Sequence, residues 1–206
     1  WSPPQGDVAE VGYDAFTKGA FGLEAFPLKY AVVAGRVSSA AFTTTVEDGR
    51  SLWETYGFLP NSKAAALKEP LCESNADQWL PYGFAVTNYV PMTAVQTSLK
   101  FAGLTCSSCH SGQLRHADGT LSQPISGMGN MDLDVIAFTD AVRNAVMDPD
   151  LTADKILDAY AKVCPDESTG LIDGIVEKIM LGGWLSGVRE SMGGDTAKYG
   201  LPYHGI

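Results

Sequence analysis

The chain has 206 residues, a formal net charge of −10, 45% hydrophobic residues and 18% charged residues. A chain of this length buries most of its apolar surface as one large domain or two small ones. No run approaches the roughly 18 uninterrupted apolar residues that cross a bilayer, and Lys and Arg do not cluster as phosphate binding requires. We therefore expect a soluble, folded protein with no transmembrane segment and no nucleic-acid partner, whose charge-guided partner is basic at the contact.

The first half of the chain gives few clear secondary-structure signals. Helical spacing of apolar residues predicts an amphipathic helix over residues 7–18. Residues 23–60 suggest turns and short pieces, and residues 61–89 have the weak periodicity of a long surface segment tied down by something other than helix packing. Pro91 is typical of the first turn of a helix, which we place over residues 92–101.

The second half gives stronger helical patterns. Residues 132–147 carry apolar side chains on one helical face, and Thr152 is an N-cap candidate for a helix over residues 153–163. A third segment, from Leu171 to Ile179, is expected to stop at the glycine pair that begins at Gly182. These patterns predict a mostly helical fold with long irregular connections.

The segment Cys106–His110, with sequence CSSCH, carries the clearest chemistry. Attachment of haem c adds two thiols across the two porphyrin vinyl groups, and a two-residue gap followed by histidine suits both the thioethers and an axial imidazole. We predict one covalent haem c on Cys106 and Cys109, with His110 as the proximal ligand of the iron. A thioredoxin-type redox pair and half of a zinc site are the alternatives, because both also use two cysteines separated by two residues.

Neither alternative finds its usual sequence context. A thioredoxin-type pair follows a buried strand, and the preceding residues 100–105 show no such pattern. A structural zinc site needs a second close pair of ligands, whereas Cys72 and Cys164 are isolated in the sequence.

Cys72 and Cys164 remain once the haem has two thiols. In the oxidising compartment that haem c proteins occupy, an even remainder of two is most simply a disulfide; two separate buried thiols are the alternative. The chain opens at Trp1 without a charged and hydrophobic leader, so we expect an exported protein, periplasmic or extracellular, whose signal segment has been removed.

The ligand on the opposite side of the iron decides the role of the haem. An electron-transfer cytochrome closes that position with a second His or a Met, and a catalytic haem keeps it open. By residue type and loop position, His204, Met128 and Met131 are the distal candidates, and an open position is the alternative. His116 lies too close to His110 in sequence to reach the other haem face easily and suits a surface or propionate contact.

The order of motifs along the chain resembles the rubber-oxygenase-like branch of the di-haem cytochrome c peroxidase superfamily. The segments that carry the resemblance are Gly12-Tyr13, Phe26-Pro27, Leu80–Phe84, Leu104–Leu114 and Gly127–Asp134. The resemblance implies cytochrome c-like haem domains, often secreted, in which one haem moves electrons and another reacts with peroxide, oxygen or a substrate. In that family the segment after a motif like Leu201–Gly205 runs on toward a second CxxCH. A second haem domain or subunit beyond Ile206, or a shortened single-haem relative, is therefore expected.

The patterns and the resemblance together predict a mainly α, cytochrome c-like haem domain with long irregular loops over residues 91–206. Residues 1–90 are expected to form an N-terminal helical and loop extension, or to be continuous with that domain. The favoured function is electron transfer outside the cytoplasm. The alternative is a peroxidase- or oxygenase-like haem enzyme domain, in which Arg115, Gln113 or Glu190 is available to assist at an open iron.

Overall fold

The structure is a computed structural model that describes residue 16 and residues 26–38, 50–61, 63, 70–89, 96–167 and 170–198. The side chains of residues 50–52, 89, 96, 97, 171 and 191–198 lie outside this description. Its elements are β1 (Phe26–Pro27), α2 (Leu28–Val37), α3 (Arg50–Thr55), α4 (Ala76–Trp79), β2 (Phe84–Tyr89), β3 (Gln96–Leu104), α5 (Cys106–Cys109), β4 (Ser111–Gly112), β5 (Ile125–Ser126), α6 (Val135–Met147), α7 (Ala153–Val163), the 3₁₀ helix η2 (Pro165–Glu167) and α8 (Leu171–Lys198).

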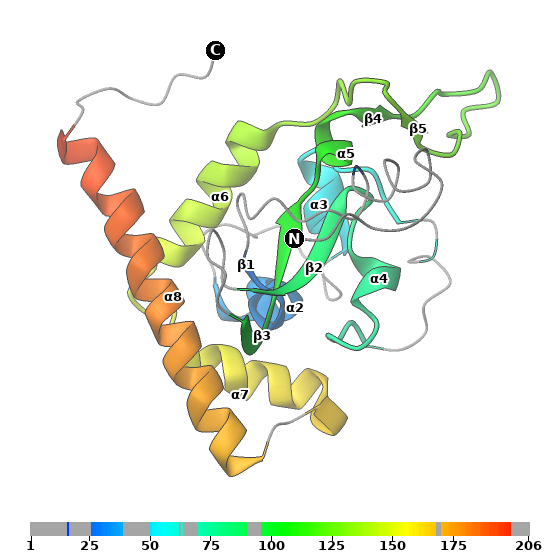
Figure 1. Ribbon diagram of the computed structural model, residues 1–206. Helices are drawn as coiled ribbons and strands as arrows, with labels where there is room; N and C mark the ends of the chain where they lie inside the picture. Colours follow the sequence, from blue (N-terminus) through cyan, green and yellow to red (C-terminus); the bar gives the residue numbers. More distant parts are fainter. Residues whose placement is uncertain are drawn as a thin grey trace, which may run out of the picture.

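A three-stranded antiparallel sheet lies at the centre of the molecule, in the order β1-β3-β2 (Figure 1). About half of the described residues are helical and 15% lie in strands, so the fold is mixed α/β, and the expected mainly α, cytochrome c-like fold is wrong. The helix predicted over residues 92–101 is also wrong in its described part, because residues 96–101 belong to β3. Leu99, Phe101 and Ala102 are all buried in this strand. A central strand buried on both faces lacks the polar alternation by which strands are recognised.

Helix α2 was not predicted from the sequence, for a related reason. Its residues from Leu28 to Ala34 are buried without interruption, Lys29 included. The helix packs against β3 and α7. It has only two charged residues in ten, Lys29 and Arg36, and a short, mostly apolar run of this kind does not distinguish a helix from a strand.

Aromatic side chains join the sheet to the neighbouring helices. Phe58 lies 4.9 Å from Phe138 of α6 between ring centroids, and Trp53 of α3 lies 5.1 Å from Phe84 of β2. Phe26 of β1 stacks on Trp53 at 5.6 Å. The expected boundary between an N-terminal extension and a haem domain lies at residue 90. The hydrophobic core contains residues that precede and residues that follow this position in the sequence, and β3 pairs with two strands that precede it.

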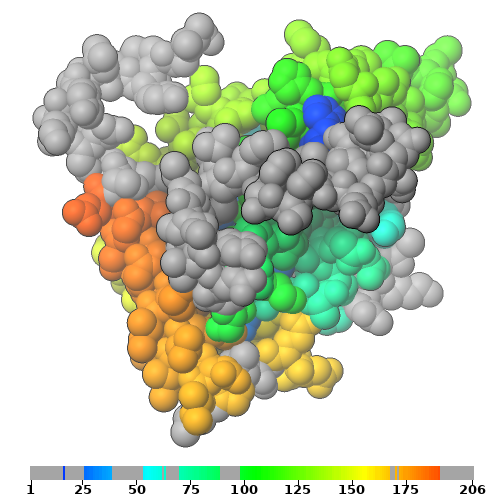
Figure 2. Space-filling model, in the orientation of Figure 1, coloured from blue at the N-terminus to red at the C-terminus, as the bar shows by residue number. Residues whose placement is uncertain are grey.

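The predicted helices of the second half are present. Asp134 caps α6 by accepting a hydrogen bond from Ala137 N, and Thr152 caps α7 by accepting one from Lys155 N at 3.3 Å. Helix α8 does not stop at Gly182 as predicted, because Leu181 and Leu185 are buried against the core on either side of the glycines. The helix runs along one edge of the molecule (Figures 1 and 2).

Within the segment 61–89, the described residues 70–89 are more deeply packed than expected. Leu71, Cys72 and Trp79 are buried, and the Trp79 indole N–H donates to Cys72 O at 2.9 Å. The predicted disulfide is confirmed: Cys72 is bonded to Cys164 at the end of α7, with Cα atoms 5.9 Å apart. The helix predicted over residues 7–18 lies outside the described residues apart from helical Phe16. None of the described helices combines the length and the apolar character needed to span a membrane.

Candidate functional site

The CSSCH segment forms one helical turn, α5, at the end of the central strand. Thr105 has extended backbone, and the turn begins directly after it. Ser107 and Ser108 are buried, whereas Cys106, Cys109 and His110 are exposed. Because positions i, i+3 and i+4 share one face of a helix, the turn presents both thiols and the imidazole together on the solvent side.

The buried side of this turn is fixed by the backbone of Gly83, which precedes β2. The Gly83 carbonyl accepts hydrogen bonds from Thr105 N at 2.8 Å, from Thr105 Oγ1 at 2.9 Å and from Ser108 Oγ. Thr105 Oγ1 also lies 2.8 Å from Ser107 Oγ. Gly83 has a φ of +91°, and a Cβ at this position would lie 2.5 Å from Ser108 Cα. A glycine is therefore required at position 83 for the turn to sit where it does.

The chain beyond His110 leaves in a hairpin and then returns to the turn. Strands β4 and β5 pair, and this segment protrudes at the top right of Figure 1. On the return, Gly127 N donates to His110 O at 2.8 Å and Asn130 N donates to Cys109 O at 2.9 Å. The Asn130 side chain also donates to Gly57 O at 2.9 Å. The carbonyls at the end of α5 are thus bound by the loop that precedes α6.

The other predicted site residues are distributed over this hairpin and beyond it. Met128 is half-buried and its Cγ lies 3.0 Å from where a Cβ on Gly112 would be, so it covers the backbone two residues after His110. Met131 is 91% exposed. His116 is exposed in the hairpin, as expected for a surface histidine, and His204 lies outside the described residues.

The side chains that were available for chemistry at an open iron are not gathered around one point. Arg115 donates to Gly119 O at 3.0 Å, and Gln113 donates to Ser122 O at 2.8 Å, both within the hairpin. Glu190 lies exposed on α8. The structure therefore adds no catalytic group to the CSSCH turn from these three candidates.

Several large apolar side chains in the segment that follows the turn are exposed. Within residues 114–136 they are Leu114, Leu121, Ile125, Met131 and Ile136. The described residues fit a covalently bound porphyrin through their donor groups: two exposed thiols with an exposed histidine directly after the second.

The structure bears on the two alternatives for the cysteine pair, a zinc site and a thioredoxin-type redox pair. Within the described ranges, no three His, Cys, Asp or Glu side chains converge as metal ligands, which leaves the zinc alternative without support. The sequence argument against a thioredoxin-type pair was wrong, because a buried strand does precede Cys106. Helix α5, however, is only four residues long, and so short a helix supplies little of the dipole that lowers the pKa of such a thiol.

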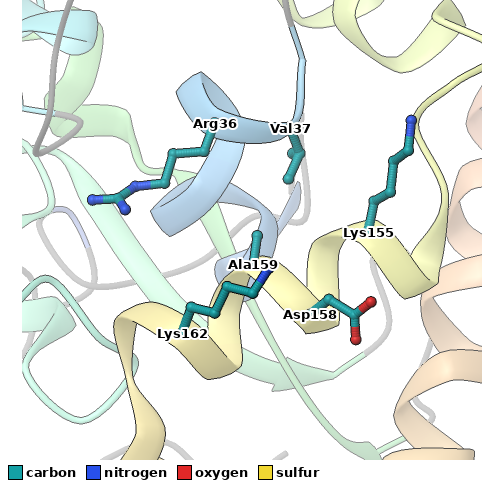
Figure 3. A pocket seen from close by; sticks show the side chains of 6 residues that line it. All are labelled: Arg36, Val37, Lys155, Asp158, Ala159 and Lys162. Carbon is teal, nitrogen blue, oxygen red and sulfur yellow. The ribbon is translucent and has the colours of Figure 1, made fainter.

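A separate groove of about 440 Å³ lies between α2 and α7 (Figure 3). Its charged lining consists of Arg36, Lys155, Asp158 and Lys162. In Figure 3 the charged ends of Arg36 and Lys155 point away from each other, so these groups do not converge on a common ligand position. We assign no binding role to this groove.

The supporting residues of the CSSCH turn could not be named from the sequence. The Gly83 carbonyl accepts from the hydroxyls of Thr105 and Ser108, and the Asn130 side chain donates to Gly57 O, so each contact joins residues that are distant in sequence. The available signal was their place in the short segments Leu80–Phe84 and Gly127–Asp134, which the resemblance had already marked. Comparison of the chain with protein-family models, with curated proteins and with solved structures gave no match.

Proposed function

We propose that this chain is a c-type cytochrome, in the sense that it binds one haem covalently through Cys106 and Cys109, and that it transfers electrons outside the cytoplasm. The observation that carries the proposal is the exposure of Cys106 and Cys109 on α5 and of His110 directly after it, while Ser107 and Ser108 between them are buried. When bound, the haem supplies a one-electron redox centre. The mixed α/β fold does not bear on this proposal, because attachment depends on the local turn.

The chain's own residues have distinct tasks in this proposal. Cys106 and Cys109 hold the porphyrin edge, and His110 directs its imidazole to the iron. Thr105 and Ser108 fix the turn to Gly83 O, so the backbone that carries the three side chains is positioned before the group is bound. A turn held in place in advance loses less entropy on binding.

The state of the other two cysteines supports the proposed location. Cys72 and Cys164 form the disulfide, while Cys106 and Cys109 are in none. Disulfides persist in oxidising compartments such as the periplasm and the extracellular space. The net charge of −10 favours a redox partner that is basic at the contact, and the family resemblance adds a second haem domain or subunit as a candidate partner.

Acid-acetone extraction of the purified chain tests the covalent attachment. We expect the red colour to stay with the protein in the wild type and to be extracted, or absent, in Cys106→Ala/Cys109→Ala. Extraction of the colour from the wild type would reject thioether attachment.

The optical spectrum tests the axial ligand and the electron-transfer role. The two histidines His110 and His116 form a matched pair, since both are exposed and only six residues apart. His110→Ala should abolish the wild-type low-spin spectrum and His116→Ala should preserve it. A wild-type spectrum that is five-coordinate and high-spin, and that shifts with carbon monoxide, would overturn the electron-carrier role in favour of a haem enzyme domain.

A further inference from the structure

A buried cluster of charged groups lies apart from the CSSCH turn, beside the disulfide. Lys29 of α2 and Glu177 of α8 form an ion pair of 2.6 Å, with side chains only 3% and 4% exposed. Because an ion pair this deep in the protein is poorly solvated, its strength depends on every other charge nearby.

Tyr160 of α7 connects this ion pair to two further carboxyl groups. Its ring centroid lies 5.0 Å from Lys29 Nζ, within range of a cation–π contact. Its hydroxyl donates to Glu167 Oε2 and accepts from Glu73 N at 3.0 Å. Glu167 of η2 also accepts from Glu73 N at 3.1 Å, so its acceptor capacity is used by these neighbours.

Glu73 lies next to the disulfide residue Cys72, and its carboxyl group differs from the others in its surroundings. Its Oε1 atom is shielded from solvent and has no hydrogen-bond partner among the described residues. Charged groups on four elements act on the Glu73 carboxyl. Lys29 of α2 and Lys100 of β3 favour its ionised form, whereas Glu177 of α8 and Glu167 of η2 oppose ionisation. Burial is the largest influence, and together these effects raise the pKa of Glu73 to about 7.

Tyr160 and Glu167, which neighbour Glu73, do not change their protonation near neutral pH. Burial raises the pKa of Tyr160, and its hydrogen bond to Glu167 raises it further, so the phenol stays neutral. Burial alone would raise the pKa of Glu167, but hydrogen bonds from Ser74, Tyr160 and Glu73 N leave it below the ordinary value. Near neutral pH, Glu73 is therefore the carboxyl that changes its charge, while Glu167 remains ionised.

We propose that Glu73, Lys29, Tyr160, Glu167 and Glu177, which we call the Glu73 cluster, form a pH-sensitive latch on the first half of α8. With a proton on Glu73, Glu177 is the carboxylate that pairs with Lys29 and holds α8 to α2. When Glu73 releases that proton to solvent, a second carboxylate competes for Lys29 and repels Glu177. The contact between α2 and the first half of α8 then loosens.

The direction of the effect follows from linkage. The Glu73 carboxyl has a higher pKa when α8 is closed than when α8 is open. It therefore stabilises the closed state, and this stabilisation is complete at pH values below the open-state pKa. That stabilisation is lost as pH rises through about 7. For a single proton the opening constant rises by at most about tenfold per pH unit over this window. Opening of α8 should therefore become more frequent as the pH goes from 5.5 to 7.5 and level off above that.

Hydrogen exchange of the full chain, corrected for the intrinsic pH dependence of exchange, tests the latch. Between pH 5.5 and 7.5 we expect the protection of amides in residues 172–181 to fall by roughly tenfold or more, with α6 as an internal reference. Glu73→Gln imitates the protonated form and should remove this dependence. Asp77→Asn is the matched control, since the Asp77 side chain is 70% exposed, and should behave as the wild type.

Two results would overturn the proposal. One is wild-type protection of residues 172–181 that does not change with pH relative to α6, a result that needs no variant to fold. The other is an infrared band of a protonated carboxyl that persists in Glu73→Gln at pH 6 and disappears by pH 8.5, because another group would then hold the proton. Neither result bears on haem attachment, so the latch and the proposed function are tested separately.

Discussion

Replacement of Gly83 by alanine tests whether the CSSCH turn is held by the backbone contact on its buried side. Gly83 has a φ of +91°, and a Cβ there would lie 2.5 Å from both Ser108 N and Ser108 Cα. These atoms belong to the backbone of α5, which cannot rotate away as a side chain could. The new methyl group can be accommodated only if β2 or α5 shifts.

The expected cost has two parts. Left-handed backbone at a non-glycine residue costs about 1–2 kcal/mol. A shift large enough to relieve the contact also weakens the hydrogen bonds that the Gly83 carbonyl accepts from Thr105 and Ser108, each worth about 0.5–1.5 kcal/mol. We expect Gly83→Ala to lower the free energy of unfolding by roughly 3–6 kcal/mol in total.

Gly119→Ala separates the two parts of this cost. Gly119 has a similar φ, +87°, but no heavy atom lies within 4 Å of its would-be Cβ, so only the conformational cost of about 1–2 kcal/mol applies. Urea unfolding followed by circular dichroism measures both variants, and haem content per chain reports whether the turn still accepts the group. If Gly83→Ala costs no more than Gly119→Ala, the reasoning about the Ser108 contact is wrong.

Three further substitutions probe the rest of the framework. Cys72→Ser/Cys164→Ser should lower the free energy of urea unfolding by about 4–5 kcal/mol, because the disulfide closes a long loop; a wild type that is equally stable under reducing conditions would contradict this. Arg189→Ala should cost about 2–4 kcal/mol in the same assay, since this guanidinium donates to three backbone carbonyls at 2.7–2.8 Å; a loss below about 0.5 kcal/mol, typical of a surface residue, would refute it. Lys29→Met should cost about 3–5 kcal/mol by removing the positive charge of the buried Lys29–Glu177 ion pair, and Lys29→Met/Glu177→Leu should recover most of it; additive costs would show that the ion pair is not the cause.

Helices were predictable where one side of the helix faces water. α6 and α7 have an apolar stripe, a polar face and a side-chain cap at Asp134 or Thr152, so local sequence contains the information that determines them. α2 and β3 are short, mostly apolar runs that are largely buried, and such runs do not distinguish a helix from a strand. Their conformation depends on partners that are distant in sequence, which no local pattern records.

The candidate site divides in the same way. The disulfide followed from counting cysteines once two were assigned to the haem, and the structure confirms it. The chemistry of Cys106, Cys109 and His110 is local and can be inferred from five residues. Its support is not local, since the bond from Ser108 to Gly83 spans 25 residues and the bond from Asn130 to Gly57 spans 73.

The local geometry of α5 bears directly on the choice between a haem anchor and a redox dithiol. A helix dipole is one source of the stabilised thiolate that a dithiol needs, and α5, which ends after a single turn, supplies little of it. A haem anchor needs instead two thiols and an imidazole that are accessible from outside the turn. Burial of Ser107 and Ser108 leaves Cys106, Cys109 and His110 as the exposed members of the segment, and the Gly83 carbonyl fixes the turn. This arrangement favours the haem anchor that we propose.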